Sequence, residues 1–447
     1  MDLSDLSVQN PWWSNKDSIA DDEKVKEVMT KKERLIVNLP DENLILIGSR
    51  QLGKTTALKY DIYKKIIKEG IKPQNILYYS FDLIADYNLI IEVLTAFCAQ
   101  NDDKKYIYFD EISFVKDWQR AIKFFLDSAS SKNSRIYITS SSSINLRKEL
   151  FPGRNIRIME YRPADFRTFA MSFGSGEIAN FLKSNFVTNL EKIAEKAEKA
   201  TVYFDELLRL FKIYVYSGGY PKVIFEFIED GKVADATYEI YFNAFLSDLG
   251  KVNRRIDIAE AILQGILISY SSKLSFSSIA KSQNIGSHVT VNEYLSVLKD
   301  LFTIYELFAS IGDNGKTLSF RKERKIYFTD PFLYRLFSNK LNVVDREAES
   351  KLVEGIVLDH LMRMTGFSSI NGVNNRLFYY NAKKEIDFIL DKSAIEVKWQ
   401  NSPNSSDFPK SGFKFKFLLT KKTLELKGEV KLIPVPLFLA FIEASRV

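Results

Sequence analysis

Residues 44–56 read LILIGSRQLGKTT, an aliphatic run that leads into a glycine-rich loop. The spacing of Gly48, four residues and then Gly53-Lys54-Thr55 is G-x-x-x-x-G-K-[ST], the pattern of a phosphate-binding loop. We expect the aliphatic run to be a buried strand and the glycines to let the backbone curl around an anion. A helix that begins at Lys54 would favour the same anion through its N-terminal partial charge. The alternative is a chance match in a turn that contains Gly and Lys.

The loop assigns expected tasks to its residues. Lys54 would reach the β- and γ-phosphates and Thr55 would hold Mg²⁺, so the predicted cofactors are ATP and Mg²⁺. The remaining contacts to the nucleotide are expected from the loop as a whole, which comprises Gly48, Ser49, Arg50, Gln51, Leu52, Gly53, Lys54, Thr55 and Thr56.

A second signal follows at residues 106–111, which read YIYFDE. Four strand-forming residues deliver Asp110 and Glu111 to the end of a strand. Asp110 would bind Mg²⁺ through water, and Glu111 would orient and deprotonate the attacking water. Nucleotide kinases and small GTPases do not usually need a base at this place, so Glu111 favours hydrolysis of ATP at the β–γ bond over a small-molecule kinase. An Asp-Glu pair is often only a solvated turn, but here it follows a phosphate loop.

The composition of the 447 residues limits the class of protein. A hydrophobic content of 46% provides for a large core, and a net charge of +6 is compatible with nucleic-acid binding without being diagnostic of it. Two histidines and one cysteine argue against a structural zinc site, and Cys98 is expected to be a reduced core residue. No signal pattern and no apolar run of membrane-spanning length occurs, which predicts a soluble cytoplasmic protein.

The sequence patterns predict an α/β protein of five segments. They are an N-terminal arm (1–40), a P-loop ATPase core (41–170), a helical lid (171–257), a winged helix (258–345) and a C-terminal α/β nuclease-like domain (346–447). In the arm, the tryptophans of Asn10-Pro11-Trp12-Trp13 are expected to pack it onto the core. The alternative is that one of them stacks near the adenine.

Strands alternate with helices in the core, including helices at 54–69 and 115–130, and this predicts a parallel sheet with helices on both faces. In the additional-strand class of P-loop ATPases, the strand after the Asp-Glu strand lies between it and the phosphate-loop strand. That strand would place Thr139 or Ser140 beside the γ-phosphate as a sensor. The alternative is a serine run that caps a helix near 144. The expected strands are 43–47, 75–80, 105–109, 135–139 and 156–160.

Three predicted helices (258–271, 277–283 and 288–300) and two β-like segments (302–309 and 317–328) follow the order of a winged helix. Winged helices bind DNA or dock proteins. The third helix carries no Arg or Lys before Lys299, so the better phosphate candidate is the basic run on the wing, Arg321-Lys322-Glu323-Arg324-Lys325.

A second set of polar residues lies in the C-terminal segment, on two strands predicted at 385–390 and 394–399. In Glu396-Val397-Lys398 the strand period of two sends Glu396 and Lys398 to one face. Asp387 and Glu396 would bind a divalent metal, Lys398 would position water, and Glu354 on the preceding helix could add a ligand. The alternative is a structural cluster in which the acids pair with Lys398. Further strands are predicted at 376–380, 413–419 and 430–435.

The whole chain resembles the archaeal and bacterial P-loop ATPases of the AAA_14/DUF4143 type, a branch of the AAA+ ATPases, with a PD-(D/E)XK nuclease-like C-terminal domain. Two departures are Ser140-Ser141, where the family more often has Gly-Ser, and the segment EYRPADFRTF, which is usually richer in leucine. The matching residues are Gly48 to Thr56, Phe109-Asp110-Glu111, Asp117-Trp118, Thr139-Ser140-Ser141, Pro152-Gly153-Arg154, Gly218-Gly219-Tyr220-Pro221 and Glu396-Val397-Lys398.

The resemblance implies ATP hydrolysis, assembly into a homo-oligomer, and a C-terminal domain whose nuclease activity is open. By its position, Arg154 would be an arginine finger or sensor that reaches a γ-phosphate in the same subunit or across an interface. The alternative for Arg154 is a surface salt bridge.

Two functions remain in competition. The first is an ATPase that acts on DNA through a basic winged-helix and nuclease-like region. The second is an ATP-dependent switch that controls assembly with a protein partner, with an inactive nuclease-like domain as a docking surface.

Overall fold

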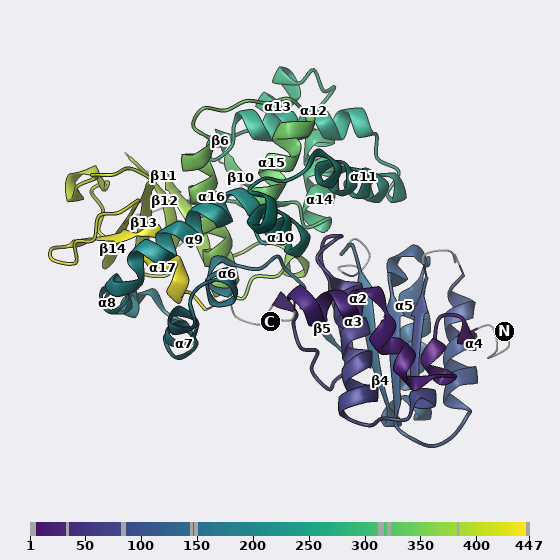
Figure 1. The fold of residues 1–447 in the computed structure, drawn as a ribbon. Coiled ribbons are helices and arrows are strands. Elements are labelled where there is room, and N and C mark those ends of the chain that lie inside the picture. Colours follow the sequence, from purple (N-terminus) through teal and green to yellow (C-terminus); the bar gives the residue numbers. More distant parts are fainter. Residues whose placement is uncertain are drawn as a thin grey trace. The chain divides into compact units, whose positions relative to one another are not determined.

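The computed structural model describes residues 6–32, 35–81, 86–143, 146, 151–311, 317–319, 323–381 and 384–443 (Figure 1). The chain forms two compact units, Met1–Arg162 and Pro163–Val447. Arg321 and Lys322 of the predicted basic run, and most of the helix expected near 144, lie outside the described residues.

The N-terminal unit is built on a five-stranded parallel sheet in the order β2-β3-β4-β1-β5. The predicted α/β class is therefore confirmed, as is the placement of the additional strand β4 between the phosphate-loop strand β1 and the Asp-Glu strand β3. Most strand residues are buried, as expected for a parallel sheet covered on both sides. The strands are β1 (Leu44–Ile47), β2 (Ile76–Ser80), β3 (Lys105–Asp110), β4 (Ser134–Ser140) and β5 (Arg157–Glu160).

Helices cover both faces of this sheet. Helix α3 (Lys54–Tyr63) connects β1 to β2 across the sheet in one direction. Helices α4 (Tyr87–Cys98) and α5 (Trp118–Asp127) make connections in the opposite direction, and they pack against each other. Because such crossovers are right-handed, α3 lies on one face, with α2 (Glu23–Glu27) beside it, and α4 and α5 lie on the other.

The N-terminal arm covers the free edge of β2, the outermost strand. The side chain of Asn10 donates to Tyr78 O (2.9 Å) and accepts from Tyr78 N (2.7 Å), so it pairs with the edge as a neighbouring strand would. The indole nitrogens of Trp12 and Trp13 both donate to the carbonyl oxygen of Ile76, at 3.2 and 2.8 Å. Ile76 is the first residue of β2, so it lies at the amino-terminal ends of the strands, whereas the phosphate loop lies at their carboxyl ends. The tryptophans therefore pack the arm onto the core, as expected.

The C-terminal unit begins with a helical stretch, interrupted by the turn at Gly218. This residue has a positive φ of +63°, and a Cβ here would lie 2.0 Å from Oδ1 of the buried Asp330. The next residue, Gly219, donates its N–H to Asp330 Oδ2 at 2.8 Å. Close packing against Asp330 explains Gly218, and close packing against the backbone of Ala164, whose carbonyl oxygen would lie 2.0 Å from a Cβ, explains Gly219. The helices are α6 (Phe166–Phe173), α7 (Gly176–Ser184), α8 (Ile193–Lys199), α9 (Phe204–Ser217), α10 (Pro221–Asp230), α11 (Asp235–Lys251) and α12 (Ile256–Ile268).

Helices α13 (Phe276–Ser282) and α14 (His288–Asp300) follow and lead into a β-hairpin that serves two sheets. Its inner half forms the three-stranded sheet β6-β10-β7, and its outer half, β8 and β9, joins the C-terminal sheet through a parallel pairing of β8 with β11. The two β-like segments expected from the sequence are therefore each divided between two sheets. The strands are β6 (Lys273–Leu274), β7 (Ile304–Leu307), β8 (Ala309–Ile311), β9 (Thr317–Ser319) and β10 (Arg324–Phe328).

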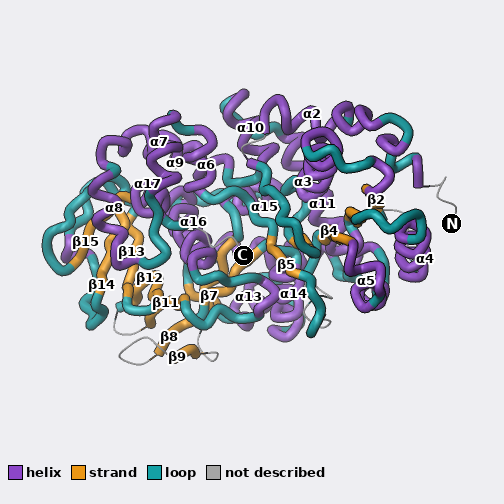
Figure 2. The backbone as a smooth tube through the Cα atoms, turned by 90° about the horizontal axis from the view of Figure 1, so that it is seen from below, coloured by secondary structure: helices purple, strands orange, loops and turns teal. Residues whose placement is uncertain are grey.

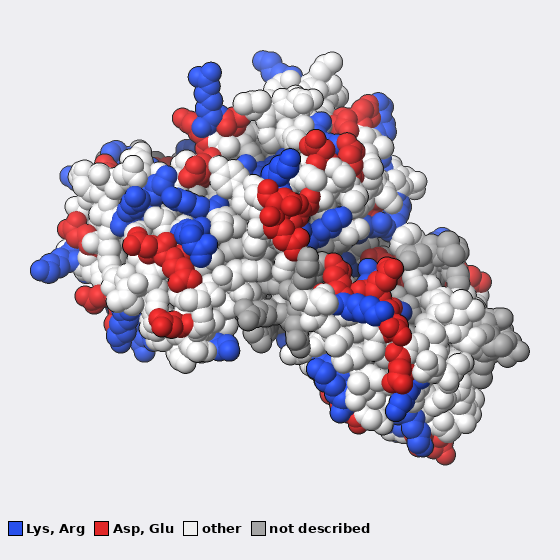
Figure 3. All heavy atoms as spheres, viewed as in Figure 1, with Lys and Arg blue, Asp and Glu red and all other residues white. Residues whose placement is uncertain are grey.

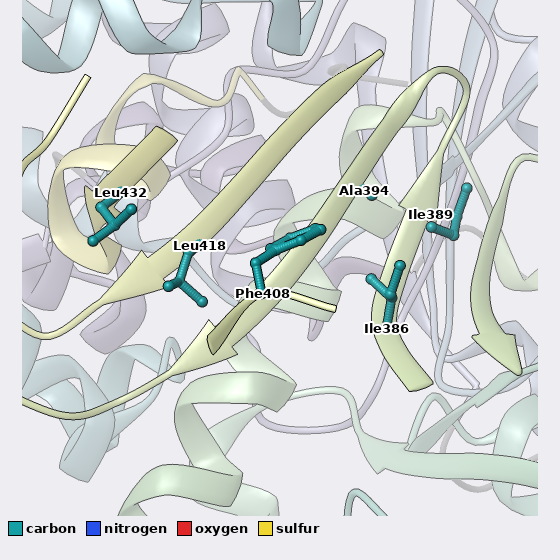
Figure 4. Packing of buried hydrophobic residues seen from close by; sticks show 6 residues of the cluster. All are labelled: Ile386, Ile389, Ala394, Phe408, Leu418 and Leu432. Atoms are coloured by element: carbon teal, nitrogen blue, oxygen red, sulfur yellow. The ribbon is translucent and has the colours of Figure 1, made fainter. Parts of the chain in front are cut away.

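The C-terminal sheet has seven strands in the order β15-β14-β13-β12-β11-β8-β9, which can be followed in Figure 2. Buried aliphatic residues and Phe408 form a core cluster on β12, β13, β14 and β15 (Figure 4). Helices α16 (Ala348–Met364) and α17 (Val435–Phe441) pack against this sheet, and α15 (Pro331–Lys340) packs on α16. The strands are β11 (Leu377–Asn381), β12 (Glu385–Leu390), β13 (Ser393–Lys398), β14 (Phe415–Thr420) and β15 (Val430–Pro434).

Candidate functional site

The predicted phosphate loop lies between the carboxyl end of β1 and the start of α3. Gln51 and Gly53 have positive φ angles of 63° and 96°, so the chain curls back on itself before the helix begins at Lys54. At Gly48 a Cβ would lie 2.2 Å from Tyr161 O, so only glycine fits there. The loop thus has the tight turn and the helix N-terminus that an anion site requires.

Lys54 is buried and its side chain folds over this loop. Its Nζ donates to the carbonyl oxygens of Gly48 (2.7 Å) and Ser49 (2.9 Å). A buried ammonium beside this loop is a strong attractor for the charge of a phosphate. The position of the Lys54 ammonium group therefore fits the phosphates of a nucleotide.

The two residues predicted to hold Mg²⁺ lie side by side. Asp110 at the end of β3 lies close enough to Thr55 for the Thr55 hydroxyl to lower the pKa of its carboxyl group. Its Oδ2 accepts from the hydroxyl of Tyr78 at 2.8 Å, and its Oδ1 accepts from Thr139 at 2.5 Å. Burial raises the pKa of Asp110 above its usual range, and the hydroxyl groups of Thr139 and Thr55 oppose this shift. One hydroxyl and one carboxylate at this place fit Mg²⁺, which prefers oxygen ligands and is commonly held by few protein groups together with phosphates.

Glu111 follows Asp110 with a left-handed backbone, at φ 51°. Its Oε2 is buried and has no hydrogen-bond partner among the described residues. A buried carboxylate oxygen without a donor is costly, and structures retain such atoms where a ligand or a water is to bind. This is the environment expected for the base that activates a water.

The structure distinguishes the two sensor candidates. The hydroxyl of Thr139 donates to Asp110 and accepts from the backbone N–H of Glu111 at 2.9 Å, so it links the two acidic residues. Ser140 instead closes a turn with Ser142, donating to the Ser142 carbonyl oxygen at 2.7 Å. The geometry brings Thr139 into the site and gives Ser140 a local role in the chain.

Arg154 lies away from this group. It forms a bidentate salt bridge with Asp127 at the end of α5, at 3.0 and 2.7 Å. It precedes β5, whose first residue Arg157 pairs with Leu44 at the start of β1, whereas the phosphate loop follows the other end of β1. Arg154 therefore lies near the amino-terminal ends of the strands, whereas the phosphate loop of the same subunit lies at their carboxyl ends.

Tyr78 is a residue of the site that sequence reasoning missed. It lies on β2, next to β3, and its hydroxyl orients Asp110. Tyr78 is the middle residue of β2 and pairs with Tyr108, so its link to Asp110 depends on the sheet order, which places β2 next to β3 and which the sequence did not predict.

The second set of predicted residues also comes together, in the C-terminal unit. Asp387 N donates to Glu396 Oε2 at 3.3 Å, and Lys398 pairs with Glu396 at 2.7 Å. Glu354 on α16 lies close enough for the charge of Asp387 to act on it. Burial first, and then Asp387, raise the pKa values of Glu354 and Glu396 above their usual range.

The cluster contains a cation that the sequence did not predict there. Lys325 on β10 is 2% exposed, and its Nζ lies 3.2 Å from Glu354, 2.7 Å from Glu385 and 3.3 Å from Asp387. Burial would lower the pKa of Lys325, but Tyr327 and the carboxylates raise it well above its usual range. Across the residues that the structure describes, no group of three or more His, Cys, Asp or Glu side chains could hold a metal ion.

Comparison with protein families matches two segments of the chain. Residues 40–170 match AAA_14, described as an AAA domain, and residues 208–342 match DUF8612, described as a domain of unknown function. The region that carries the phosphate loop and the paired acids is thus an AAA domain, and this part of the expected resemblance is confirmed. In the part of the chain that the structure describes, every helix is too short or too polar to span a bilayer.

The chain is also similar to individual proteins. A protein of Haemophilus influenzae described as uncharacterized is 22% identical over 371 residues, which covers 79% of this chain and 82% of that protein. Among solved structures, the RuvB Holliday junction branch migration motor of Thermotoga maritima is 15% identical, with a TM-score of 0.25, and covers 59% of this chain and 81% of its own. The Aeropyrum pernix ORC1 protein in complex with DNA is 13% identical, with a TM-score of 0.30, and covers 73% and 96%. TM-scores this low carry no weight for function.

Proposed function

We propose that the AAA domain binds ATP with Mg²⁺ and hydrolyses the β–γ bond. The observation that carries this proposal is the buried Oε2 of Glu111, which has no hydrogen-bond partner among the described residues, next to Asp110, which Thr139 holds by a hydrogen bond and beside which Thr55 lies. A site that only binds a nucleotide has no need for a buried carboxylate oxygen that lacks a hydrogen-bond donor.

Each residue then has a defined task. Lys54 holds the β- and γ-phosphates in exchange for its contacts with the loop carbonyl oxygens, while Thr55 and Asp110 hold the cation. Glu111 takes the proton of the attacking water, and Thr139 fixes the positions of both acidic residues. Bound Mg²⁺ would neutralise the charge that develops on the phosphate oxygens.

Replacement of Lys54 tests the nucleotide site. In Lys54→Ala, we expect loss of both ATP binding and phosphate release, because the phosphates lose their main cation. Lys68→Ala, an exposed lysine further along the same helical segment, is the matched control and should behave as wild type. Full phosphate release by Lys54→Ala would rule the site out.

We infer further that this ATPase serves as a switch for a protein partner. The exposed side chains of α14 include His288, Val289, Asn292 and Glu293 and contain no cation for phosphate. Arg324 and Lys299 pair with Glu306, and Lys325 is buried. Of the cations expected to contact DNA through the wing, the two that the structure describes, Arg324 and Lys325, are thus engaged within the unit.

Action on DNA is the competing function. Its support is the excess of fifteen Lys and Arg over ten Asp and Glu in residues 351–447. On the face drawn in Figure 3, however, basic and acidic side chains are interspersed. Duplex DNA should therefore leave the ATPase rate unchanged, whereas stimulation that weakens steeply with salt would establish the DNA function.

A further inference from the structure

We propose that the ammonium group of Lys325 takes the place of the divalent cation in the C-terminal cluster of Glu354, Asp387 and Glu396. This nuclease-like site would then be a cluster of ion pairs that binds no metal. Glu354, Asp387 and Glu396 are the residues that a PD-(D/E)XK-like core would use for the metal. Lys325 contacts two of them, Glu354 and Asp387, and reaches Glu385 as well.

Both carboxylate oxygens of Asp387 and both of Glu396 are already engaged. Asp387 accepts from Lys325 through Oδ1 and from Val397 N through Oδ2, at 3.3 and 2.9 Å. Glu396 accepts from Lys398 through Oε1 and from Asp387 N through Oε2. Coordination of Mg²⁺ at about 2.0–2.1 Å would require these donors to move. The residues therefore do not fit a metal in this arrangement.

The charges support the same assignment. Glu385 pairs with Lys273 as well as with Lys325, at 2.9 and 2.7 Å. Together, four carboxylates (Glu354, Glu385, Asp387 and Glu396) meet three ammonium groups (Lys273, Lys325 and Lys398). The cations offset most of the negative charge that would attract a metal ion. Buried charges are retained where partners satisfy them, and here the partners come from the protein.

The ion pairs also have a structural effect. Lys325 belongs to β10 in the three-stranded sheet, whereas Glu385 and Asp387 belong to β12 in the C-terminal sheet. Tyr327, also on β10, donates its hydroxyl to Glu354 at 2.5 Å. Two side chains of one strand thus tie the hairpin to strand β12 of the second sheet and to helix α16, at a buried point where water does not compete.

The test measures how many Mn²⁺ ions the full chain binds in the absence of nucleotide. Binding is measured from the decrease of the free Mn²⁺ signal in electron paramagnetic resonance. Wild type and Asp387→Asn should bind the same number of ions. Lys325→Met should bind one more ion per chain, and Lys325→Met/Asp387→Asn should lose it again. Lys273→Met, which removes a half-buried cation from the rim of the same cluster and leaves Lys325, should gain none.

Thermal unfolding gives a second readout, because an ion that binds the folded state raises Tm. Mn²⁺ should raise the Tm of Lys325→Met by several degrees more than that of wild type. An Asp387-dependent ion in wild type would overturn the proposal, and so would a folded Lys325→Met that binds no additional ion. If Lys325→Met does not fold, the comparison of wild type with Asp387→Asn decides: equal binding supports the proposal and unequal binding overturns it.

Discussion

At the scale of single residues, the site depends on one hydroxyl that links two acids. Thr139 donates to Asp110 and accepts from the backbone of Glu111, so a single side chain sets the positions of a metal ligand and a base. It is fully buried, where a hydrogen bond is not weakened by competition with water.

Replacement of this hydroxyl should affect hydrolysis more than binding. We expect Thr139→Val to lower the turnover of ATP by about 10- to 100-fold, which is typical for residues that orient metal ligands through hydrogen bonds. Thr139→Ser keeps the hydroxyl and should retain most of the activity. The measurement is steady-state phosphate release, with ATP affinity measured in parallel. Equal rates for the two variants would show that the hydroxyl has no such role.

At the scale of elements, sequence patterns predicted the strands and helices of the core because their signals are local. The aliphatic strand before Gly48 and the paired acids after 106–109 each carry their own evidence of burial and direction. The position of Lys325 could not be predicted in this way. Its carboxylate partners are 29 to 62 residues further along the chain, and its neighbours in sequence resemble a solvated basic run. The burial of Lys325 is a tertiary effect.

The turn between α9 and α10 allows a prediction about packing. Gly218→Ala should lower the free energy of unfolding of the C-terminal unit by about 3 kcal/mol or more, since a left-handed backbone is combined with an overlap on the buried Asp330. Gly231 has a similar φ of +70°, but a Cβ there would meet nothing within 4 Å.

The control Gly231→Ala should cost only about 1–2 kcal/mol, because Gly231 has the αL backbone (ψ 2°) and open space, whereas Gly218 has ψ −156°, a backbone that disfavours a Cβ more strongly, in addition to the overlap. Urea unfolding of the two variants measures the difference. Equal losses of stability would show that Asp330 yields to the new methyl group and that the close packing is not required.

At the scale of the whole molecule, the position of Arg154 bears on assembly. Arg154 lies at the end of the sheet opposite the phosphate loop of its own subunit. A catalytic role for Arg154 therefore requires that it act on the nucleotide of a neighbouring subunit. We expect Arg154→Ala to lower turnover by about 10³-fold if it acts as a finger, with little change in ATP affinity. Arg157→Ala, on the same segment and paired with Glu42, is the matched control.

Mixed assemblies test this directly. Arg154→Ala subunits retain Glu111, and Glu111→Gln subunits retain Arg154, so a mixture should recover part of the activity that each lacks alone. Full activity of Arg154→Ala by itself would leave Arg154 with only its salt bridge to Asp127.

The central claim is that the N-terminal unit hydrolyses ATP with Glu111 as the base. Its most direct test is single-turnover hydrolysis of ATP bound to wild type and to Glu111→Gln, with binding of ATP and Mg²⁺ measured on the same samples. We predict that Glu111→Gln binds ATP and Mg²⁺ as wild type does and hydrolyses it more slowly by about 10²-fold or more. Hydrolysis at the wild-type rate by Glu111→Gln would contradict the account.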